Sequence, residues 1–130
     1  MANLDYKKLY KLQDKVLEQV FKNEKIFYLT GGTCLNRFYK EKRYSDDLDF
    51  FTNDNQDFYR AIRSIRVLFK KYFQVTEEIT SKDFIRFKIN NLLQVDFVND
   101  RVARYKDPVY LKNGYIIDNI ENILSNKITA

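Results

Sequence analysis

The sequence predicts one α/β (α+β) domain, in which helices flank a mixed β-sheet. Two observations predict it: helical and extended patterns alternate early in the chain, and extended patterns cluster later. Together they indicate a sheet with both parallel and antiparallel strands. The chain has 130 residues, 45% of them hydrophobic, with 11 Phe and 10 Tyr, so a single core spanning residues 1–130 is expected.

The first helix is expected at residues 4–21. Four apolar residues recur there at helical spacing, with Lys, Gln and Asp between them: Leu9, Leu12, Val16 and Val20. Asn23 and Glu24 end this helix. Residues 25–30 read Lys-Ile-Phe-Tyr-Leu-Thr, which predicts a short buried strand.

A glycine turn follows this strand. Gly31-Gly32-Thr33 leads directly into a short helical stretch. After a polar loop at residues 43–46, a strand is expected at residues 48–52, where side chains alternate between two faces.

The clearest helix is expected at residues 55–72. Its apolar stripe consists of Phe58, Ile62, Ile65, Phe69 and Tyr72. Four basic residues occupy the opposite side, which we interpret as a solvated face: Arg60, Arg63, Arg66 and Lys70. Asn53, three residues before Gln56, is the expected N-cap.

Three strands are expected after this helix, at residues 73–79, 84–89 and 92–98. Residues 115–117 are expected to form one more short strand. Asp118 is then expected to cap a final helix at residues 119–127.

Alternation also predicts how two of these strands face each other. A three-residue loop at residues 89–91 pairs Phe87 with Leu93 and Ile85 with Val95 on one buried face. The opposite face then carries three charged residues: Arg86, Lys88 and Asp96. The basic pair is thus predicted beside the acidic residue, placed to meet phosphate groups, although both side chains could equally be simple solvent-facing residues.

Two features of the chain suit phosphate and metal chemistry. Gly31 and Gly32 lack side chains, so backbone N–H groups at a helix start can approach an anion. Asp47 and Asp49 point to one face of a strand, where two carboxylates repel unless a cation lies between them. Such hard oxygen ligands suit Mg²⁺. A third carboxylate, Asp96, lies inside an otherwise apolar strand.

Composition excludes several other kinds of site. The chain has no His, which excludes Ser-His-Asp and Cys-His catalysis and His-based zinc sites. Its lone cysteine, Cys34, excludes an internal disulfide and is expected to be a small packed residue of a cytoplasmic protein. No apolar run approaches the ~20 residues of a membrane helix, so no membrane partner is expected. The net charge of +5 favours phosphate-rich partners but is also compatible with ordinary solubility.

Two motifs together resemble a known signature, namely Gly31-Gly32-Thr33 and Arg43-Tyr44-Ser45-Asp46-Asp47-Leu48-Asp49-Phe50-Phe51. They are similar to the AbiEii/AbiGii toxin family of the DNA polymerase β-like nucleotidyltransferase superfamily, and the resemblance extends over residues 27–130. It implies the nucleotidyltransferase fold and a metal-dependent transfer of a nucleoside monophosphate from a nucleoside triphosphate, such as ATP or GTP, to an acceptor hydroxyl. The implied acceptor is RNA, in particular tRNA, and the implied role is that of a toxin in a toxin–antitoxin or abortive-infection system.

The resemblance also implies roles for individual residues. Asp47, Asp49 and Asp96 would bind two Mg²⁺ ions, and Asp96 would help to deprotonate the attacking hydroxyl. The triphosphate would be held by Gly31, Gly32, Thr33, Arg43 and Ser45. Lys88 is expected beside them from the strand alternation described above, independently of the resemblance. Lys127 matches a family lysine that would neutralise the departing pyrophosphate.

The family pattern continues beyond Ala130, so a C-terminal region is missing here relative to the family. We expect a truncated form, the product of a split or decayed gene, or a minimal form completed by another polypeptide or by self-association. A cognate antitoxin is a further expected partner. Three other functions fit the sequence: a transferase acting on protein or on a small molecule such as an antibiotic, a non-catalytic remnant that binds nucleotide, and a plain nucleic-acid-binding domain.

Overall fold

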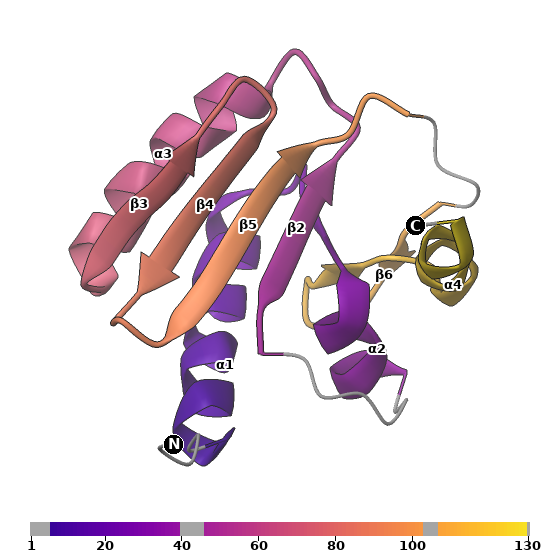
Figure 1. Cartoon of the computed structure of the whole chain (residues 1–130), viewed down its shortest axis with the longest axis horizontal. Helices are drawn as coiled ribbons and strands as arrows, with labels where there is room; N and C mark the ends of the chain where they lie inside the picture. Colours follow the sequence, from indigo (N-terminus) through magenta and orange to yellow (C-terminus); the bar gives the residue numbers. More distant parts are fainter. Residues whose placement is uncertain (1–5, 40–45, 103–106, 130) are drawn as a thin grey trace.

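The computed structural model describes residues 6–39, 46–102 and 107–129, with side chains described through Leu124. This part of the chain forms a seven-stranded sheet with helices on and beside it (Figure 1). In chain order the elements are α1 (Tyr6–Asn23), β1 (Tyr28–Thr30), α2 (Gly31–Phe38), β2 (Leu48–Thr52), α3 (Phe58–Tyr72), β3 (Val75–Thr80), β4 (Phe84–Ile89), β5 (Leu93–Asn99), β6 (Val109–Tyr110), β7 (Ile116–Ile117) and α4 (Ile120–Thr129).

The strand order across the sheet is β3-β4-β5-β2-β1-β7-β6. β2 runs parallel to β5 and β1 runs parallel to β7, whereas the other neighbours are antiparallel. The predicted mixed sheet is therefore confirmed. The expected strands at residues 48–52 and 84–89 have the bounds of β2 and β4.

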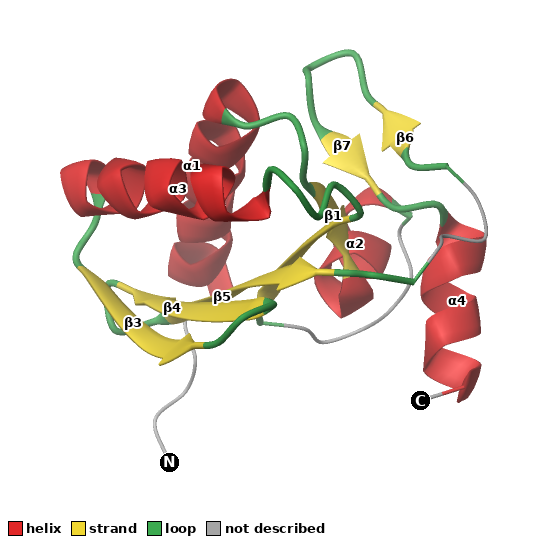
Figure 2. Ribbon diagram, turned by 90° about the horizontal axis from the view of Figure 1, so that it is seen from above, coloured by secondary structure: helices red, strands yellow, loops and turns green. Residues whose placement is uncertain are grey.

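Helices α1 and α3 cover one face of the sheet (Figure 2). The predicted apolar stripes face the core, with the exception of Tyr72, which is 50% exposed. Aromatic rings fill the space between helices and sheet: Phe50 stacks on Phe97 at 5.1 Å, and Phe69 packs edge-on against Phe87 at 5.3 Å. Because each fully buried Phe contributes about 1.5–3 kcal/mol, this cluster holds the helices on the sheet.

The other face of β3, β4, β5 and β2 carries no helix within the described part of the chain (Figures 1 and 2). Side chains alternate along β2, β4 and β5, so buried residues face the helices and partly exposed residues face away, with the exception of Asp96, which is buried on the second side. We call this second side the open face. On β4 it carries Phe84, Arg86 and Lys88.

The β4–β5 hairpin has the predicted faces but not the predicted partners. Phe87 pairs with Val95, not Leu93, and Ile89 pairs with Leu93. The three-residue loop lies at residues 90–92, one residue later than expected, because Asn90 and Asn91 both adopt positive φ angles of 53° and 54°. A shift of the pairs by two residues leaves every side chain on its predicted face.

The predicted start of the long helix is wrong. α3 begins at Phe58, three residues later than expected, and Asn53 does not cap it. The Asn53 amide instead donates to the carbonyls of Asp100 and Val102, both at 3.0 Å. Through these hydrogen bonds Asn53 joins the end of β2 to the residues after β5. Its amide is therefore not available as a helix cap.

The last part of the chain differs from prediction in two places. α4 begins at Ile120, and the Asn119 side-chain oxygen, rather than Asp118, accepts the N–H of Glu121 at its start. β6 was not expected, because its two residues are exposed and too few to show a pattern. It is recognised through its antiparallel pairing with β7.

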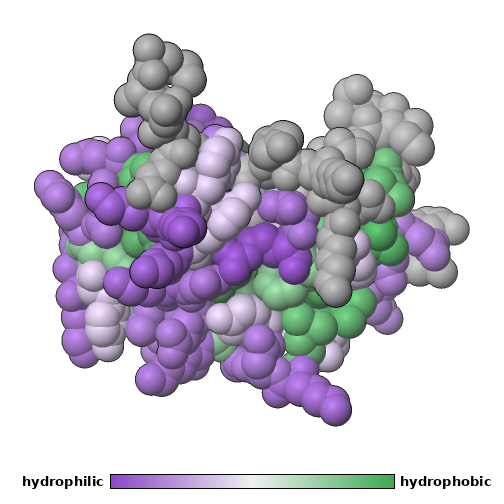
Figure 3. Space-filling view, turned by 90° about the horizontal axis from the view of Figure 1, so that it is seen from below, coloured by the Kyte–Doolittle hydropathy of each residue, from purple (hydrophilic) through white to green (hydrophobic). Residues whose placement is uncertain are grey.

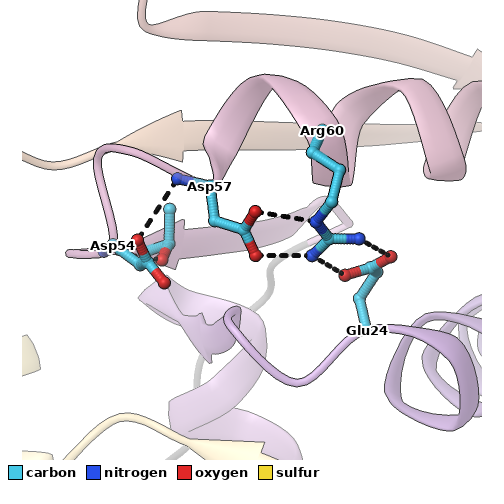
Figure 4. A network of polar contacts seen from close by, with 5 residues as sticks. Glu24, Asp54, Asp57 and Arg60 are labelled. Carbon is cyan, nitrogen blue, oxygen red and sulfur yellow. Dashed lines mark hydrogen bonds and ion pairs between the residues drawn. The ribbon is translucent and has the colours of Figure 1, made fainter.

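A charged cluster joins the end of α1 to the start of α3 (Figure 4). Arg60 donates to both carboxylate oxygens of Glu24, at 3.2 and 2.9 Å, and to both of Asp57, at 2.7 Å. Glu24 is only 4% exposed, so its charge needs such a partner. The cluster fixes the two helices of the covered face relative to each other.

Seen from below, hydrophilic side chains cover most of the left and centre of the molecule, and the largest hydrophobic area lies towards the right, the side of α2 and α4 (Figure 3). Within the residues described, none of the helices combines the length and the apolar character needed to cross a membrane.

Candidate active site

The register of the sheet arranges side chains of the open face in transverse rows. Arg86 on β4 lies opposite Asp96 on β5, Asp96 lies beside Asp49 on β2, and Asp49 lies opposite Thr30 on β1. We call these four residues the carboxylate row. The sheet thus brings Asp49 and Asp96 side by side, although they come from strands far apart in the sequence.

A second row lies next to the carboxylate row and contains the remaining predicted carboxylate. Lys88 pairs with Gln94, and Asp47 immediately precedes the pair formed by Leu48 and Val95. The Gln94 amide bridges the two rows, since it donates to Oδ2 of Asp47 at 3.2 Å and to Oδ2 of Asp96 at 3.4 Å.

The electrostatics of Asp47 show how crowded the negative charges are. Partial burial raises the pKa of Asp47, and the neighbouring charges of Asp96 and Asp46 raise it further. Lys88 and Arg86 act in the opposite direction and lower this pKa. A bound cation would relieve the repulsion among these carboxylates.

Arg86 holds Asp96 directly. Its Nε lies 2.9 Å from Oδ1 and its terminal nitrogen 3.1 Å from Oδ2, a two-point contact to a carboxylate that is only 5% exposed. The hydrogen bonds to Asp96 raise the pKa of Arg86. The predicted placement of Arg86, Lys88 and Asp96 on one face is therefore confirmed, and the pairing of Arg86 with Asp96 is an additional finding.

Gly31 makes room for Asp49. Gly31 has a φ of +79°, and a Cβ added there would lie 2.5 Å from Oδ2 of Asp49. Only glycine fits this position without displacing the carboxylate. Gly31 therefore lets the backbone at the start of α2 lie close to the Asp49 carboxylate.

Thr33 connects the glycine turn to the start of β2. Its side chain is fully buried, and its hydroxyl donates to the carbonyl of Asp47. Gln13 on α1 donates to the adjacent carbonyl of Asp46 at 3.1 Å. Two hydrogen bonds thus hold the backbone that leads into β2, which positions Asp47.

The three carboxylates form a donor set that fits a hard divalent cation. They are oxygen ligands from neighbouring positions of two adjacent strands, and their mutual repulsion is evident at Asp47. Among the described residues no group of three acidic or thiol side chains lies close enough to hold a metal ion as it stands. Asp96 is instead occupied by Arg86 and Gln94.

A scan against protein families matches residues 15–109 to AbiEii, described as nucleotidyl transferase AbiEii toxin, Type IV TA system. The match covers most of the chain and includes all three carboxylates and the glycine turn. This chain belongs to the AbiEii family.

Solved structures show the same fold as this AbiEii domain. A proposed nucleotidyltransferase from H. pylori superposes with a TM-score of 0.67 at 18% identity, covering 95% of this chain and 57% of that one. JHP933 from Helicobacter pylori gives 0.62 at 19% identity, covering 98% and 59%. MenT4, a nucleotidyltransferase toxin from Mycobacterium tuberculosis, gives 0.52 at 19% identity, covering 85% and 42%.

The AbiEii chain thus spans less than two thirds of each of these structures. Their likeness establishes the nucleotidyltransferase fold that the sequence predicts. A search of curated proteins gives no match.

The side chains of three predicted site residues of the AbiEii domain lie outside the described part. Arg43 and Ser45 fall in residues 40–45, and Lys127 lies on α4 beyond the last described side chain. Their predicted roles stay predictions. Gly32, by contrast, lies in the first turn of α2, next to Gly31.

Asp118 forms a hydrogen bond to Thr30, the residue that precedes the glycine turn, a role that the sequence did not indicate. It is buried, and its Oδ2 accepts the hydroxyl of Thr30 at 2.7 Å, directly before Gly31. Its Oδ1 accepts the N–H of Asn119 at 2.9 Å and the amide of Asn122 at 3.0 Å. The only signal in the sequence was its expected position at a helix start.

Proposed function

We propose that this AbiEii domain transfers a nucleoside monophosphate from a nucleoside triphosphate to an acceptor hydroxyl on RNA, in particular tRNA, and acts as a toxin with a cognate antitoxin. The observation that carries this proposal is the position of Asp49, which lies beside Asp96 in the carboxylate row and against Gly31 at the glycine turn. Groups suited to a metal and to a triphosphate therefore meet at one point.

Different residues of the chain have different roles in the proposed transfer. Asp47, Asp49 and Asp96 would hold two Mg²⁺ ions, and the Asp96 carboxylate would accept the proton of the attacking hydroxyl. The ions, when bound, neutralise the negative charge that develops on the transferred phosphate. Backbone N–H groups at Gly31 and Gly32 orient the triphosphate, because the first turn of a helix presents N–H groups that have no intrahelical acceptor and carries a partial positive charge.

Four residues complete the triphosphate site in this proposal. Arg43 and Ser45 contact phosphate oxygens, and Lys88 adds positive charge from β4. Lys127 neutralises the departing pyrophosphate. Support for Lys88 comes from its place opposite Gln94 and from its effect on the pKa of Asp47, which it lowers.

The RNA acceptor and the antitoxin rest on two kinds of support. The family description names a toxin of a toxin–antitoxin system, and MenT4 is a nucleotidyltransferase toxin of the same fold. The net charge of +5 suits a polyanionic acceptor.

The proposal is tested by incubating the chain with each labelled nucleoside triphosphate, Mg²⁺ and total RNA. We expect label on tRNA with the wild-type chain and none with Asp49→Ala. Asp107→Ala is the matched control, since Asp107 is an exposed aspartate that belongs to neither the carboxylate row nor the glycine turn. It should keep wild-type activity.

The products also separate the alternatives. Label on protein or on an added antibiotic, with none on RNA, would replace the RNA acceptor by another substrate. Thermal stabilisation by triphosphate and Mg²⁺ without any labelled product would identify a binding domain without turnover.

A further inference from the structure

A third row crosses the open face on the side of the carboxylate row away from Lys88. Phe84 on β4 lies opposite Val98 on β5, Val98 lies beside Phe51 on β2, and Phe51 lies opposite Tyr28 on β1. We call the first three of these residues the apolar row, because Tyr28 is buried at its end. On each strand the residue of the apolar row lies two positions from the residue of the carboxylate row, with one residue between them.

The apolar row is partly exposed although its residues are hydrophobic. Phe84, Val98 and Phe51 are each partly exposed, and Phe84 and Val98 do not belong to the side chains packed against the core. Ile79 on β3, opposite Arg86, extends the exposed apolar surface at 39% exposure. Apolar surface gathered beside a polar site is typical of a surface that binds a ligand.

The chemistry of the row suits a nucleobase. The guanidinium of Arg86 lies 5.3 Å from the centre of the Phe84 ring, so an aromatic ring and a cation lie together at the edge of the carboxylate row. Single-stranded nucleic acids bind to sheet surfaces through bases that stack on aromatic side chains and phosphates that meet basic ones. Lys88 and Arg86 provide basic side chains for phosphates on the same face.

The position of the row favours the acceptor over the base of the triphosphate. In the sheet order, β1 with the glycine turn lies on one side of Asp49, and β5 and β4 lie on the other. Attacking and leaving oxygens take roughly opposite sides of a transferred phosphate. If the triphosphate lies at the glycine turn, the acceptor hydroxyl arrives from the side of β5 and β4, where Phe84 and Val98 lie.

We propose that Phe84, Val98 and Phe51 form a platform on which the terminal base of a single-stranded RNA acceptor stacks, so that its hydroxyl lies over Asp96. This inference rests on the proposed function, because it takes the acceptor to be RNA. It adds a binding surface that the carboxylates and the glycine turn do not include.

The platform is tested by binding, with Mg²⁺ and without triphosphate, so that no transfer can occur. Fluorescence anisotropy compares a labelled single-stranded RNA with the same RNA whose 3′-terminal nucleotide is abasic. The wild-type chain should prefer the intact RNA by about 5- to 150-fold, the range expected for one base stacked on an aromatic ring. Phe84→Ala should lose this preference, and Phe84→Tyr should keep it.

Tyr72→Ala is the matched control. Tyr72 is an exposed aromatic residue on α3, over the covered face, and the ammonium of Lys71 lies 5.3 Å from its ring centre, as Arg86 does from Phe84. The variant should retain the wild-type preference. Should Phe84→Ala fail to fold, Phe84→Leu keeps apolar volume without an aromatic face and should lose the preference in its place.

The outcomes separate the platform from the proposed transfer. A wild-type chain that binds both RNAs equally, or a Phe84→Ala variant with an undiminished preference, overturns the platform and leaves Phe84 as a cross-strand packing residue. A preference that depends on Phe84 supports the platform even if no label is transferred to RNA, a result that would overturn the transfer alone. Label on RNA, together with a binding preference that does not depend on Phe84, supports the transfer and overturns the platform.

Discussion

Arg86 and Asp96 face each other across β4 and β5, and the guanidinium of Arg86 holds both oxygens of the Asp96 carboxylate, at 2.9 and 3.1 Å. Arg86 therefore takes the place on Asp96 that a metal ion would need. A cation that binds to all three carboxylates must compete with this guanidinium, which is then free to meet a phosphate.

The first prediction follows from this competition. Arg86→Met should tighten Mn²⁺ binding in the absence of nucleotide by roughly 3- to 10-fold, because it removes the charge-assisted hydrogen bonds that compete with the ion for Asp96. The expected gain is modest because the guanidinium is partly exposed and solvent weakens these hydrogen bonds. The measurement is a Mn²⁺ titration followed by electron paramagnetic resonance of the free ion.

Lys88→Met is the control, since it removes the same charge from the same strand without removing a hydrogen bond that the structure shows to Asp96. The gain in Mn²⁺ affinity should be smaller in this variant. Equal gains would show that net charge, rather than competition for Asp96, governs metal binding.

The second prediction concerns Gly31. Gly31→Ala should lower the free energy of unfolding and weaken Mn²⁺ binding, because the new Cβ would lie 2.5 Å from Oδ2 of Asp49 at a φ of +79°. Backbone strain alone at such an angle costs about 1–3 kcal/mol. Urea unfolding measures the loss of stability.

Gly114→Ala isolates the contribution of the backbone. Gly114 has a φ of +91°, but its added Cβ would meet only Nζ of Lys25, at 3.5 Å, an ordinary contact. It should therefore lose stability but keep Mn²⁺ binding. Wild-type Mn²⁺ affinity in Gly31→Ala would show that Asp49 does not need this space to bind the ion.

The faces of the site strands were predictable from the sequence, but their partners were not. Side chains alternate with a period of two, so Arg86, Lys88 and Asp96 share a face for any register that differs by two residues. The actual register depends on where the turn lies, and that depends on Asn90 and Asn91 both adopting positive φ. Asparagine permits this conformation without requiring it.

Contacts between distant parts of the chain were beyond prediction for a different reason. The hydrogen bond from Thr30 to Asp118 joins residues 88 positions apart and exists because β7 pairs with β1. The contact of Asp49 with Gly31 likewise requires β1 and β2 to be neighbours. Local patterns indicate strands, whereas strand order follows from packing of the whole domain.

The third prediction concerns Cys34. Burial raises the pKa of its thiol from 9.0 to about 12, so the folded chain holds almost no thiolate at neutral pH. A disulfide reagent such as DTNB should react slowly with the native chain and rapidly after unfolding in guanidinium. Rapid reaction of the native chain would show that the thiol is accessible.

The same pKa difference has a consequence for stability in base. Between pH 9.0 and about 12 the unfolded chain releases the thiol proton while the folded chain keeps it, so the free energy of unfolding should fall as the pH rises. Cys34→Ala should make this fall shallower. Burial also raises the pKa of Tyr39 to about 12, so part of the slope should remain. Identical pH slopes of the free energy of unfolding with and without Cys34 would contradict the raised pKa of the Cys34 thiol.

The fourth prediction concerns Asp118, whose carboxylate accepts hydrogen bonds from Thr30, Asn119 and Asn122 in a buried position. Asp118→Ala leaves these donors without their acceptor and should lower the free energy of unfolding by about 1–3 kcal/mol. Asp118→Asn keeps one acceptor oxygen and should lose less. Because Thr30 directly precedes Gly31, Asp118→Ala should also weaken the binding of triphosphate.

A double-mutant cycle of Asp118→Ala with Thr30→Val tests whether the two residues act together. Thr30→Val removes the hydroxyl but keeps the shape of the side chain, so the loss in the double variant should be smaller than the sum of the single losses by at least about 0.5 kcal/mol. Additive losses would mean that Asp118 stabilises only the start of α4. Coupled losses, with weaker triphosphate binding in both single variants, would show that Asp118 holds the glycine turn through Thr30.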